Sequence, residues 1–362
     1  MMGKKLLCAL LVCALGVYPA RAISAQSAVV IDADTGETLF AHNADARLPM
    51  ASTTKIMTAL VALSEGELDR VYTVKKEYTQ VEGSSMYLRT GEKLTLRDTL
   101  YGLMLASGND AALAIAGECG GLTAFVEKMN EKAQELALEN THFDNPNGLS
   151  SETHYTTAHE LAKITAAAMQ DPVFRQIVST GSYTAGEHVL SNHNRLLRMY
   201  DGAIGVKTGF TKAAGRCLVS AAERGGRTVI VVTLNDPNDW NDHMALLDEA
   251  FARYEEVTLH QAGDQLAVQR VFGGDTDEVP LLAQHTVTAF LAPGEKEKLE
   301  KVRYGDRICY APVVRTAVAG QLEYRIGSKV LARDTLVYGG ASLLPPERKS
   351  VPEHIIERIF DG

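Results

Sequence analysis

The chain has 362 residues, of which 46% are hydrophobic and 22% are charged. This composition is ordinary for globular proteins and excludes a mostly disordered or fibrous chain. The length exceeds that of one typical domain and predicts two folded units. With a formal net charge of −9 and no basic block, the chain is a poor candidate for binding nucleic acid or an anionic membrane through bulk charge.

The N-terminal segment 1–25 is typical of a secretory signal peptide. Two lysines precede an uncharged run over 6–20, and Ala20 and Ala22 form an A-x-A cleavage site. The run is shorter than the roughly 20 residues that a membrane-spanning helix needs. We therefore predict export, with cleavage after Ala22 or Ala25 and a mature protein that is secreted or attached to the outer face of the cell membrane.

The first folded unit is expected over 26–256. Strand-like runs open and close this region and helix-like runs lie between them, which predicts an α+β domain whose sheet joins both ends of the region. The expected strands cover 28–31, 37–40, 217–222 and 227–234, and the expected helical stretches cover 55–65, 96–118, 122–138, 158–170 and 239–254.

The second unit is expected over 257–348, where short β-rich runs are broken by Gly, Pro and Asp. This pattern of short runs and breaks predicts a small all-β domain. The last residues, 349–362, form a short amphipathic tail that either contacts the membrane peripherally or packs on the β domain. The apolar residues of the tail are Ile355, Ile356, Ile359 and Phe360.

Three cysteines lie outside the predicted signal peptide: Cys119, Cys217 and Cys309. An odd, sparse set is not typical of a disulfide-stabilised scaffold. We expect small buried side chains at these positions, and one disulfide remains open as an alternative.

Ser52 and Lys55 form an S-x-x-K motif at the expected start of a helix. Positions i and i+3 share a helix face, so the amine can lie beside the hydroxyl. Serine becomes a nucleophile when a neighbouring base takes its proton, and lysine serves as that base when burial or a nearby cation lowers its pKa. The alternative is a helix-capping serine followed by a surface lysine.

Two further motifs combine polar residues with a glycine. Ser107 and Asn109 flank a glycine that breaks a helical stretch, which suits either a proton relay with an amide-binding group or a plain junction between helices. Lys207, Thr208 and Gly209 suit an edge strand that meets a ligand backbone, with a turn and an ordinary strand as the alternative.

In this order, the three motifs are the set found in active-site serine penicillin-recognising enzymes. The chain resembles the low-molecular-weight penicillin-binding proteins that act as D-alanyl-D-alanine carboxypeptidases, and the segments 83–86, 143–149 and 192–196 add to this resemblance. The resemblance implies a β-lactamase/transpeptidase-like domain, in which helices flank an antiparallel sheet, followed by the all-β domain.

The resemblance also implies roles for single residues. Ser52 attacks the carbonyl between the two terminal D-alanines of a peptidoglycan stem peptide, Lys55 is the base, and Ser107 passes a proton to the leaving amine. β-Lactams are mistaken for the substrate and acylate the serine. No cofactor takes part.

Substrate binding is assigned by the same resemblance to Asn109, Lys207, Thr208, Gly209 and Phe210. The backbone N–H groups of Ser52 and Phe210 form the oxyanion hole, and Thr208 binds the terminal carboxylate. Some relatives carry an arginine after the strand that follows K-T-G, but this chain has the sequence N-D-P-N-D-W over 235–240. Carboxylate binding is therefore expected to depend on Thr208, on Lys207 or on a basic residue elsewhere.

Two alternatives stay open. A class A-like β-lactamase needs a deacylating glutamate before K-T-G, for which Glu152 is the candidate, and does not need a second β domain. A non-catalytic penicillin-binding envelope protein does not need an intact Ser52 and Lys55. No metal site is expected, because His154 and His159 are five residues apart and the sequence contains no H-E-x-x-H motif.

Overall fold

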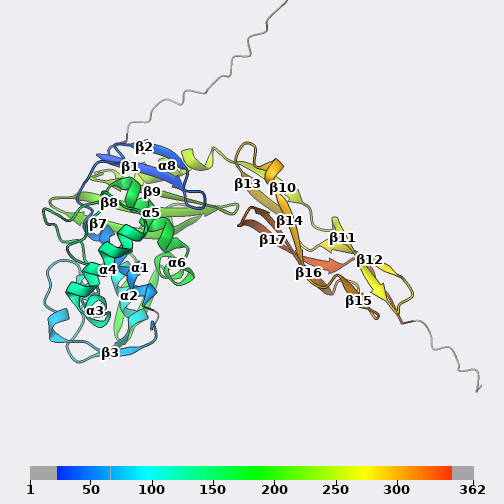
Figure 1. Cartoon of the computed structure of the whole chain (residues 1–362), viewed down its shortest axis with the longest axis horizontal. Coiled ribbons are helices and arrows are strands. Elements are labelled where there is room, and N and C mark those ends of the chain that lie inside the picture. Colours follow the sequence, from blue (N-terminus) through cyan, green and yellow to red (C-terminus); the bar gives the residue numbers. More distant parts are fainter. Residues whose placement is uncertain (1–22, 66, 345–362) are drawn as a thin grey trace, which may run out of the picture.

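The computed structural model describes residues 23–65 and 67–344, which form two domains arranged end to end (Figure 1). The first domain is α+β and the second is all-β, which confirms the predicted fold class. Residues 1–22 of the predicted signal peptide and the whole predicted tail lie outside the described residues. Within the described ranges, no helix is long and apolar enough to cross a membrane.

The first domain is built on a five-stranded antiparallel sheet with the strand order β2-β1-β9-β8-β7. The N-terminal strand β1 pairs with β9, so the sheet joins both ends of the domain, as the sequence predicts. Strand β7 forms one edge of this sheet, so within the described residues it pairs with a strand on one side only. The strands are β1 (Ser27–Asp32), β2 (Thr38–His42), β7 (Ala203–Thr211), β8 (Gly215–Arg224) and β9 (Arg227–Leu234).

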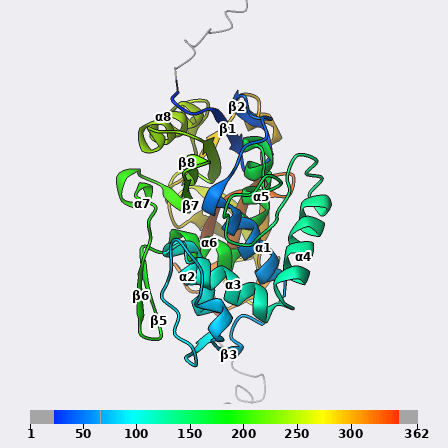
Figure 2. The same ribbon diagram turned by 90° about the vertical axis from the view of Figure 1, so that its left-hand side faces the viewer.

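Helices cover both faces of the sheet. The larger group packs on one face around α1, which contacts all the other helices of the group (Figure 2). A second apolar cluster lies on the opposite face beneath α7 (Leu196–Met199) and α8 (Asp239–Phe251). The larger group consists of α1 (Lys55–Ser64), α2 (Leu96–Leu105), α3 (Asn109–Glu118), α4 (Leu122–Glu135), α5 (Ala158–Met169) and α6 (Pro172–Ser179).

The helical stretch predicted over 96–118 is divided into α2 and α3. The chain turns at Ser107, which has a left-handed backbone (φ 58°), and Gly108 precedes the first residue of α3. Short elements complete the first domain: 3-10 turns η1 (Ala51–Thr54) and η2 (Lys76–Tyr78), and hairpins β3 (Val71–Thr73) with β4 (Lys93–Thr95) and β5 (Ser182–Ala185) with β6 (His188–Ser191).

The second domain contains a six-stranded sheet of order β14-β16-β17-β12-β11-β15 and a two-stranded sheet of β10 and β13. Its apolar clusters are small, because no strand buries more than a few of its side chains. The elements are β10 (Glu255–His260), β11 (Gln265–Phe272), β12 (Glu278–Ala283), β13 (Val287–Leu291), η3 (Lys296–Lys298), β14 (Glu300–Tyr304), β15 (Ile308–Tyr310), β16 (Val318–Ile326) and β17 (Lys329–Tyr338).

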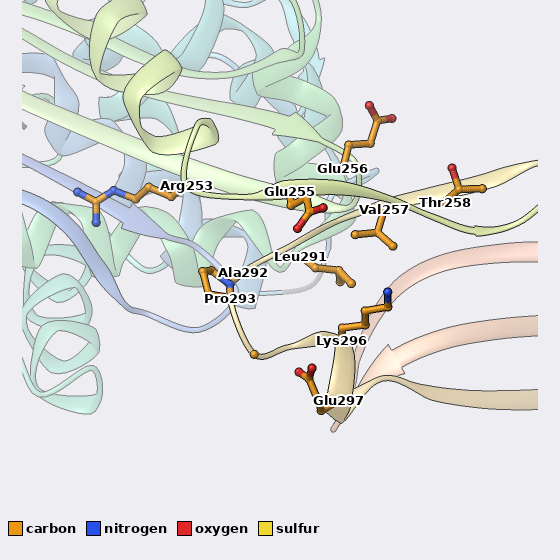
Figure 3. A pocket seen from close by; sticks show the side chains of 11 residues that line it. Arg253, Glu255, Glu256, Val257, Thr258, Leu291, Ala292, Pro293, Lys296 and Glu297 are labelled. Atoms are coloured by element: carbon orange, nitrogen blue, oxygen red, sulfur yellow. The ribbon is translucent and has the colours of Figure 1, made fainter. Parts of the chain in front are cut away.

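The domains meet around Arg227, whose side chain is 1% exposed. Its guanidinium pairs with Asp32 at 3.5 Å and with Glu295, and its Nε donates to the Phe290 carbonyl at 2.9 Å. These partners come from both domains, so the buried cation joins them. A pocket opens beside this junction, lined by residues that follow α8, by β10 and by the turn after β13, and it contains no residue of the three motifs (Figure 3).

The three cysteines outside the predicted signal peptide form no disulfide within the described ranges. Cys119 and Cys217 are buried, as expected for small core side chains. Cys309 is only half-buried, so the expectation is wrong there: β15 is a short strand at the edge of its sheet, and an edge strand is less covered than a central one.

Candidate active site

The first two motifs meet at the ammonium group of Lys55. Ser52 lies in η1, which leads directly into α1. Lys55 Nζ donates to Ser52 Oγ at 2.9 Å, to Asn109 Oδ1 at 2.7 Å and to the Asn147 carbonyl at 2.6 Å. The structure thus brings the predicted nucleophile, the predicted base and one predicted binding residue into direct contact.

Lys55 is fully buried, and the pKa of its amine is held well below the ordinary value. Burial is the main cause, and the positive charge of Lys207 adds to it, while the negative charge of Asp110 opposes both. Asn109 Oδ1 and the Asn147 carbonyl can only accept hydrogen bonds. When the amine is neutral, its lone pair can therefore receive a proton only from Ser52.

The second motif lies in the turn between α2 and α3. Ser107 is almost completely buried, but its hydroxyl makes no hydrogen bond to Ser52 or Lys55 within the described residues. The Asn109 side chain is fixed from its other end, since its Nδ2 donates to the Glu82 carbonyl at 2.6 Å. The turn thus presents the amide oxygen of this motif to the buried amine.

Two residues next to the contact between the first two motifs have a left-handed backbone conformation. Ala51, which precedes the serine of the first motif, has φ 48°, and Ser107 has φ 58°. Non-glycine residues rarely adopt this left-handed region, and such residues persist where the surrounding structure holds them. The chain is therefore constrained at both motifs.

The third motif lies on edge strand β7, next to η1. A Cβ atom at Gly209 would lie 3.1 Å from the Ser52 backbone nitrogen and 3.2 Å from Ala51 Cβ, so the absence of a side chain permits the close approach of strand and turn. Lys207 is buried, its Nζ donates to the Thr208 carbonyl at 2.8 Å, and burial lowers the pKa of its amine to about 7. Thr208 is half-buried and Phe210 is 66% exposed.

Asp110 was missed by the sequence analysis. Its carboxylate accepts the Ser85 hydroxyl at 2.6 Å and the backbone N–H groups of Met86 and Leu88, each at 3.0 Å. These bonds attach the segment 83–88 to the start of α3, opposite the candidate nucleophile. No sequence signal distinguished this aspartate, because its partners are mostly backbone groups.

Asn147 was also missed, although the segment 143–149 was noted. Its carbonyl accepts from Lys55, and the next residue, Gly148, has φ 88°. A Cβ atom there would lie 2.0 Å from the Ala51 carbonyl oxygen, which only glycine avoids. The glycine after an asparagine was the available signal for a loop pressed against η1.

His154 supports the turn of the candidate nucleophile rather than a metal site. Its Nδ1 accepts the Asp144 N–H at 3.0 Å, so Nε2–H donates to Thr54 Oγ1 at 2.8 Å. The threonine hydroxyl in turn donates to the Ala51 carbonyl at 2.7 Å. Burial lowers the pKa of the imidazole to about 4, which keeps it neutral in this chain of hydrogen bonds.

Comparisons with known proteins identify the family. The family model of D-alanyl-D-alanine carboxypeptidases matches residues 16–238, and the model of the C-terminal domain of penicillin-binding protein 5 matches residues 254–341. The D-alanyl-D-alanine carboxypeptidase DacF of Bacillus subtilis is 35% identical over 327 residues, which is 85% of this chain and 83% of the relative. A D-alanyl-D-alanine carboxypeptidase of a Streptomyces strain is 41% identical over 61% of this chain and 85% of its own length.

Solved structures give the same result. Penicillin-binding protein 5 of Haemophilus influenzae superposes with a TM-score of 0.64 at 30% identity, over 91% of this chain and all of that chain. The Streptomyces DD-transpeptidase superposes with a TM-score of 0.61 at 38% identity, over 64% of this chain and 98% of that chain. The chain therefore belongs to the D-alanyl-D-alanine carboxypeptidase family, the low-molecular-weight penicillin-binding proteins among the serine penicillin-recognising enzymes.

Proposed function

We propose that this protein removes the terminal D-alanine from peptidoglycan stem peptides through an acyl-enzyme on Ser52. The observation that carries the proposal is the buried amine of Lys55, which lies 2.9 Å from Ser52 Oγ and has a lowered pKa. A neutral amine at this distance is a general base for the serine hydroxyl.

The first step joins the enzyme to the substrate. Lys55 takes the hydroxyl proton while Ser52 Oγ attacks the carbonyl carbon between the last two D-alanines. The negative charge that develops on the carbonyl oxygen is received by the backbone N–H groups of Ser52 and Phe210. The close approach of η1 and β7 at Gly209 supports this pairing of N–H groups.

The second step breaks the C–N bond of the terminal peptide. The departing amine takes up a proton that Ser107 passes on, and free D-alanine leaves while an ester remains on Ser52. Lys207 keeps positive charge near this path when it is protonated. Water then attacks the ester, which releases the shortened peptide and restores the serine hydroxyl.

The substrate is held along the edge of β7. Asn109 binds the acyl side of the peptide, and Lys207, Thr208 and Gly209 line the strand that the peptide follows. Family members bind β-lactams, and in this chain a β-lactam would acylate Ser52 in the same way.

We also propose that residues 26–256 carry the catalysis and that the β domain over 257–348 positions them at the cell wall. Export after cleavage of residues 1–25 and peripheral membrane contact through 349–362 belong to this proposal. The first is supported by the signal-peptide pattern, and the second by the apolar residues of the tail.

The test is release of D-alanine from a stem-peptide analogue that ends in D-Ala-D-Ala. The wild-type enzyme is expected to release it, and Ser52→Ala is expected to release none while remaining folded. A β-lactam should leave a long-lived covalent adduct, detected as a mass increase on the wild type and not on S52A. Rapid hydrolysis of the β-lactam would favour the β-lactamase alternative, and no D-alanine release by the wild type would favour the non-catalytic one.

A further inference from the structure

The terminal carboxylate of the proposed substrate needs a cation close to Thr208. Lys207 is the nearest cation in sequence, but its side chain lies on the other face of the sheet. Successive side chains of a strand point to opposite faces, and directly paired residues share a face. Lys207 pairs with Val219, which packs in the cluster beneath α1. Thr208 pairs with Leu218, which packs in the cluster beneath α8. The threonine therefore belongs to the α8 face.

Arg216 lies on this same face. It pairs with Phe210, two residues along β7 from Thr208, and is thus the diagonal neighbour of the threonine across the two strands. Diagonal Cβ atoms in an antiparallel pair lie roughly 7–8 Å apart, within reach of a long side chain. The side chain of Arg216 is 44% exposed, so a ligand at the edge of β7 can meet it.

Asp239 fixes the orientation of this guanidinium. The aspartate is the first residue of α8, its side chain is buried, and it accepts Arg216 Nε at 3.1 Å and Nη2 at 2.7 Å. The indole ring of Trp240 lies beneath the guanidinium carbon at 5.8 Å. Within the part of the chain that the structure describes, Arg216 Nη1 makes no hydrogen bond. The N–H groups of this nitrogen can therefore donate to a ligand.

A second arginine reaches the same ring. Arg195, which precedes α7 beside β7, places its guanidinium carbon 5.9 Å from the ring of Trp240. Arg195 thus adds a second positive charge beside the ring, and no described salt bridge pairs it with a carboxylate.

We propose that Arg216, held by Asp239, binds the terminal carboxylate of the substrate beside Thr208. The assignment rests on the proposed function and adds to it the residue that recognises the end of the peptide. It also gives residues 235–240 a role, because Asp239 and Trp240 of this segment hold the guanidinium of Arg216 on strand β8.

The experiment compares two stem-peptide analogues, one ending in free D-Ala-D-Ala and the other in its C-terminal amide. Arg216→Gln should lower kcat/KM for the free acid by about 10- to 100-fold, the typical loss for a truncated hydrogen bond to a charged group. It should change kcat/KM for the amide by less than about threefold, because the amide has no carboxylate to pair. The preference for the acid should therefore fall by the same factor.

Two further variants separate the loss of the guanidinium hydrogen bonds from the loss of charge and from unrelated effects of substitution. Arg216→Lys keeps the charge without the forked hydrogen bonds and should retain part of the preference. Arg224→Gln, at the opposite end of the same strand, should leave the preference of the wild type unchanged.

The outcomes separate the hypotheses. The proposal is overturned if R216Q and R216K keep the wild-type preference, or if R216Q loses activity on acid and amide equally. A wild type that releases D-alanine or its amide from neither peptide would instead contradict the proposed function.

Discussion

Lys55 and Arg227 are both almost inaccessible to solvent, one in the candidate active site and the other at the domain junction. Arg227 has two carboxylate partners, Asp32 and Glu295. Among the described residues, Lys55 hydrogen-bonds only to uncharged oxygens, and the like charge of Lys207 has a larger effect on its pKa than the opposing charge of Asp110. The two cations are equally buried, but carboxylates neutralise the arginine and no hydrogen-bonded carboxylate of the described residues neutralises the lysine.

The neighbours of a buried cation thus decide whether it stabilises the fold or becomes available for proton transfer. Burying a charge costs free energy unless carboxylates compensate it, and an uncompensated lysine responds by a lowered pKa. The arginine cannot deprotonate, so its carboxylates make it a structural link. The lysine can deprotonate, so the absence of a carboxylate from its described hydrogen-bond partners suits it to the proposed role of base.

The largest expected effect is on activity, from Lys55→Met. Loss of a general base costs typically 10²- to 10⁴-fold, so acylation of Ser52 by a β-lactam should slow by that factor. Stability to urea should stay equal or rise, because the variant no longer buries a costly amine. A large loss of stability would show that the lysine serves mainly to hold the fold.

The second effect is on stability, from Arg227→Met. The variant leaves two carboxylates at the junction without their cation and should lower the free energy of unfolding by about 3–5 kcal/mol. Arg89→Met is the control, since Arg89 pairs with Glu187 on the surface and should cost less than about 1 kcal/mol. Urea denaturation measures both variants. An equal loss of unfolding free energy in R227M and R89M would contradict the structural role of Arg227.

The third effect is a shift in a pH profile, from Lys207→Met. The positive charge of Lys207 helps to lower the pKa of Lys55, so its removal should raise that pKa. Because the base must be neutral to act, the rate of β-lactam acylation should then reach its midpoint at higher pH than in the wild type. A midpoint that stays in place or moves to lower pH would disprove the coupling.

The smallest effect concerns His154, whose pKa is lowered to about 4. Between that value and the ordinary 6.5, the unfolded chain binds more protons than the folded one, so stability should fall as the pH falls through this window. One histidine can contribute a slope of at most about 1.4 kcal/mol per pH unit. His154→Gln should remove that contribution, which urea denaturation at pH 7 and pH 5 would reveal as a shallower dependence.

Much of this protein could be predicted before its structure. The contact of Ser52 with Lys55 follows from helix geometry, since an i, i+3 pair shares a face. Apolar spacing predicted α1 to α5, α8 and the strands β1, β2, β8 and β9, and the glycine beside Ser107 indicated the junction there. Helices α6 and α7 and the pairs β3–β4 and β5–β6 were not predicted. The supporting residues could not be predicted in this way: Asp110 and His154 act largely on backbone groups, which leave no pattern of side chains in the sequence.

Local spacing and composition were enough to predict an acidic chain of two units, many of its elements and the three motifs. Which charges are compensated depends on the tertiary structure. Pairing of β8 with β7 sets Arg216 beside the threonine of the third motif, and the packing of α8 brings Asp239 to it. Burial and long-range pairing set both the chemistry of Lys55 and the structural role of Arg227, since the cost of a buried charge depends on neighbours that are distant along the chain.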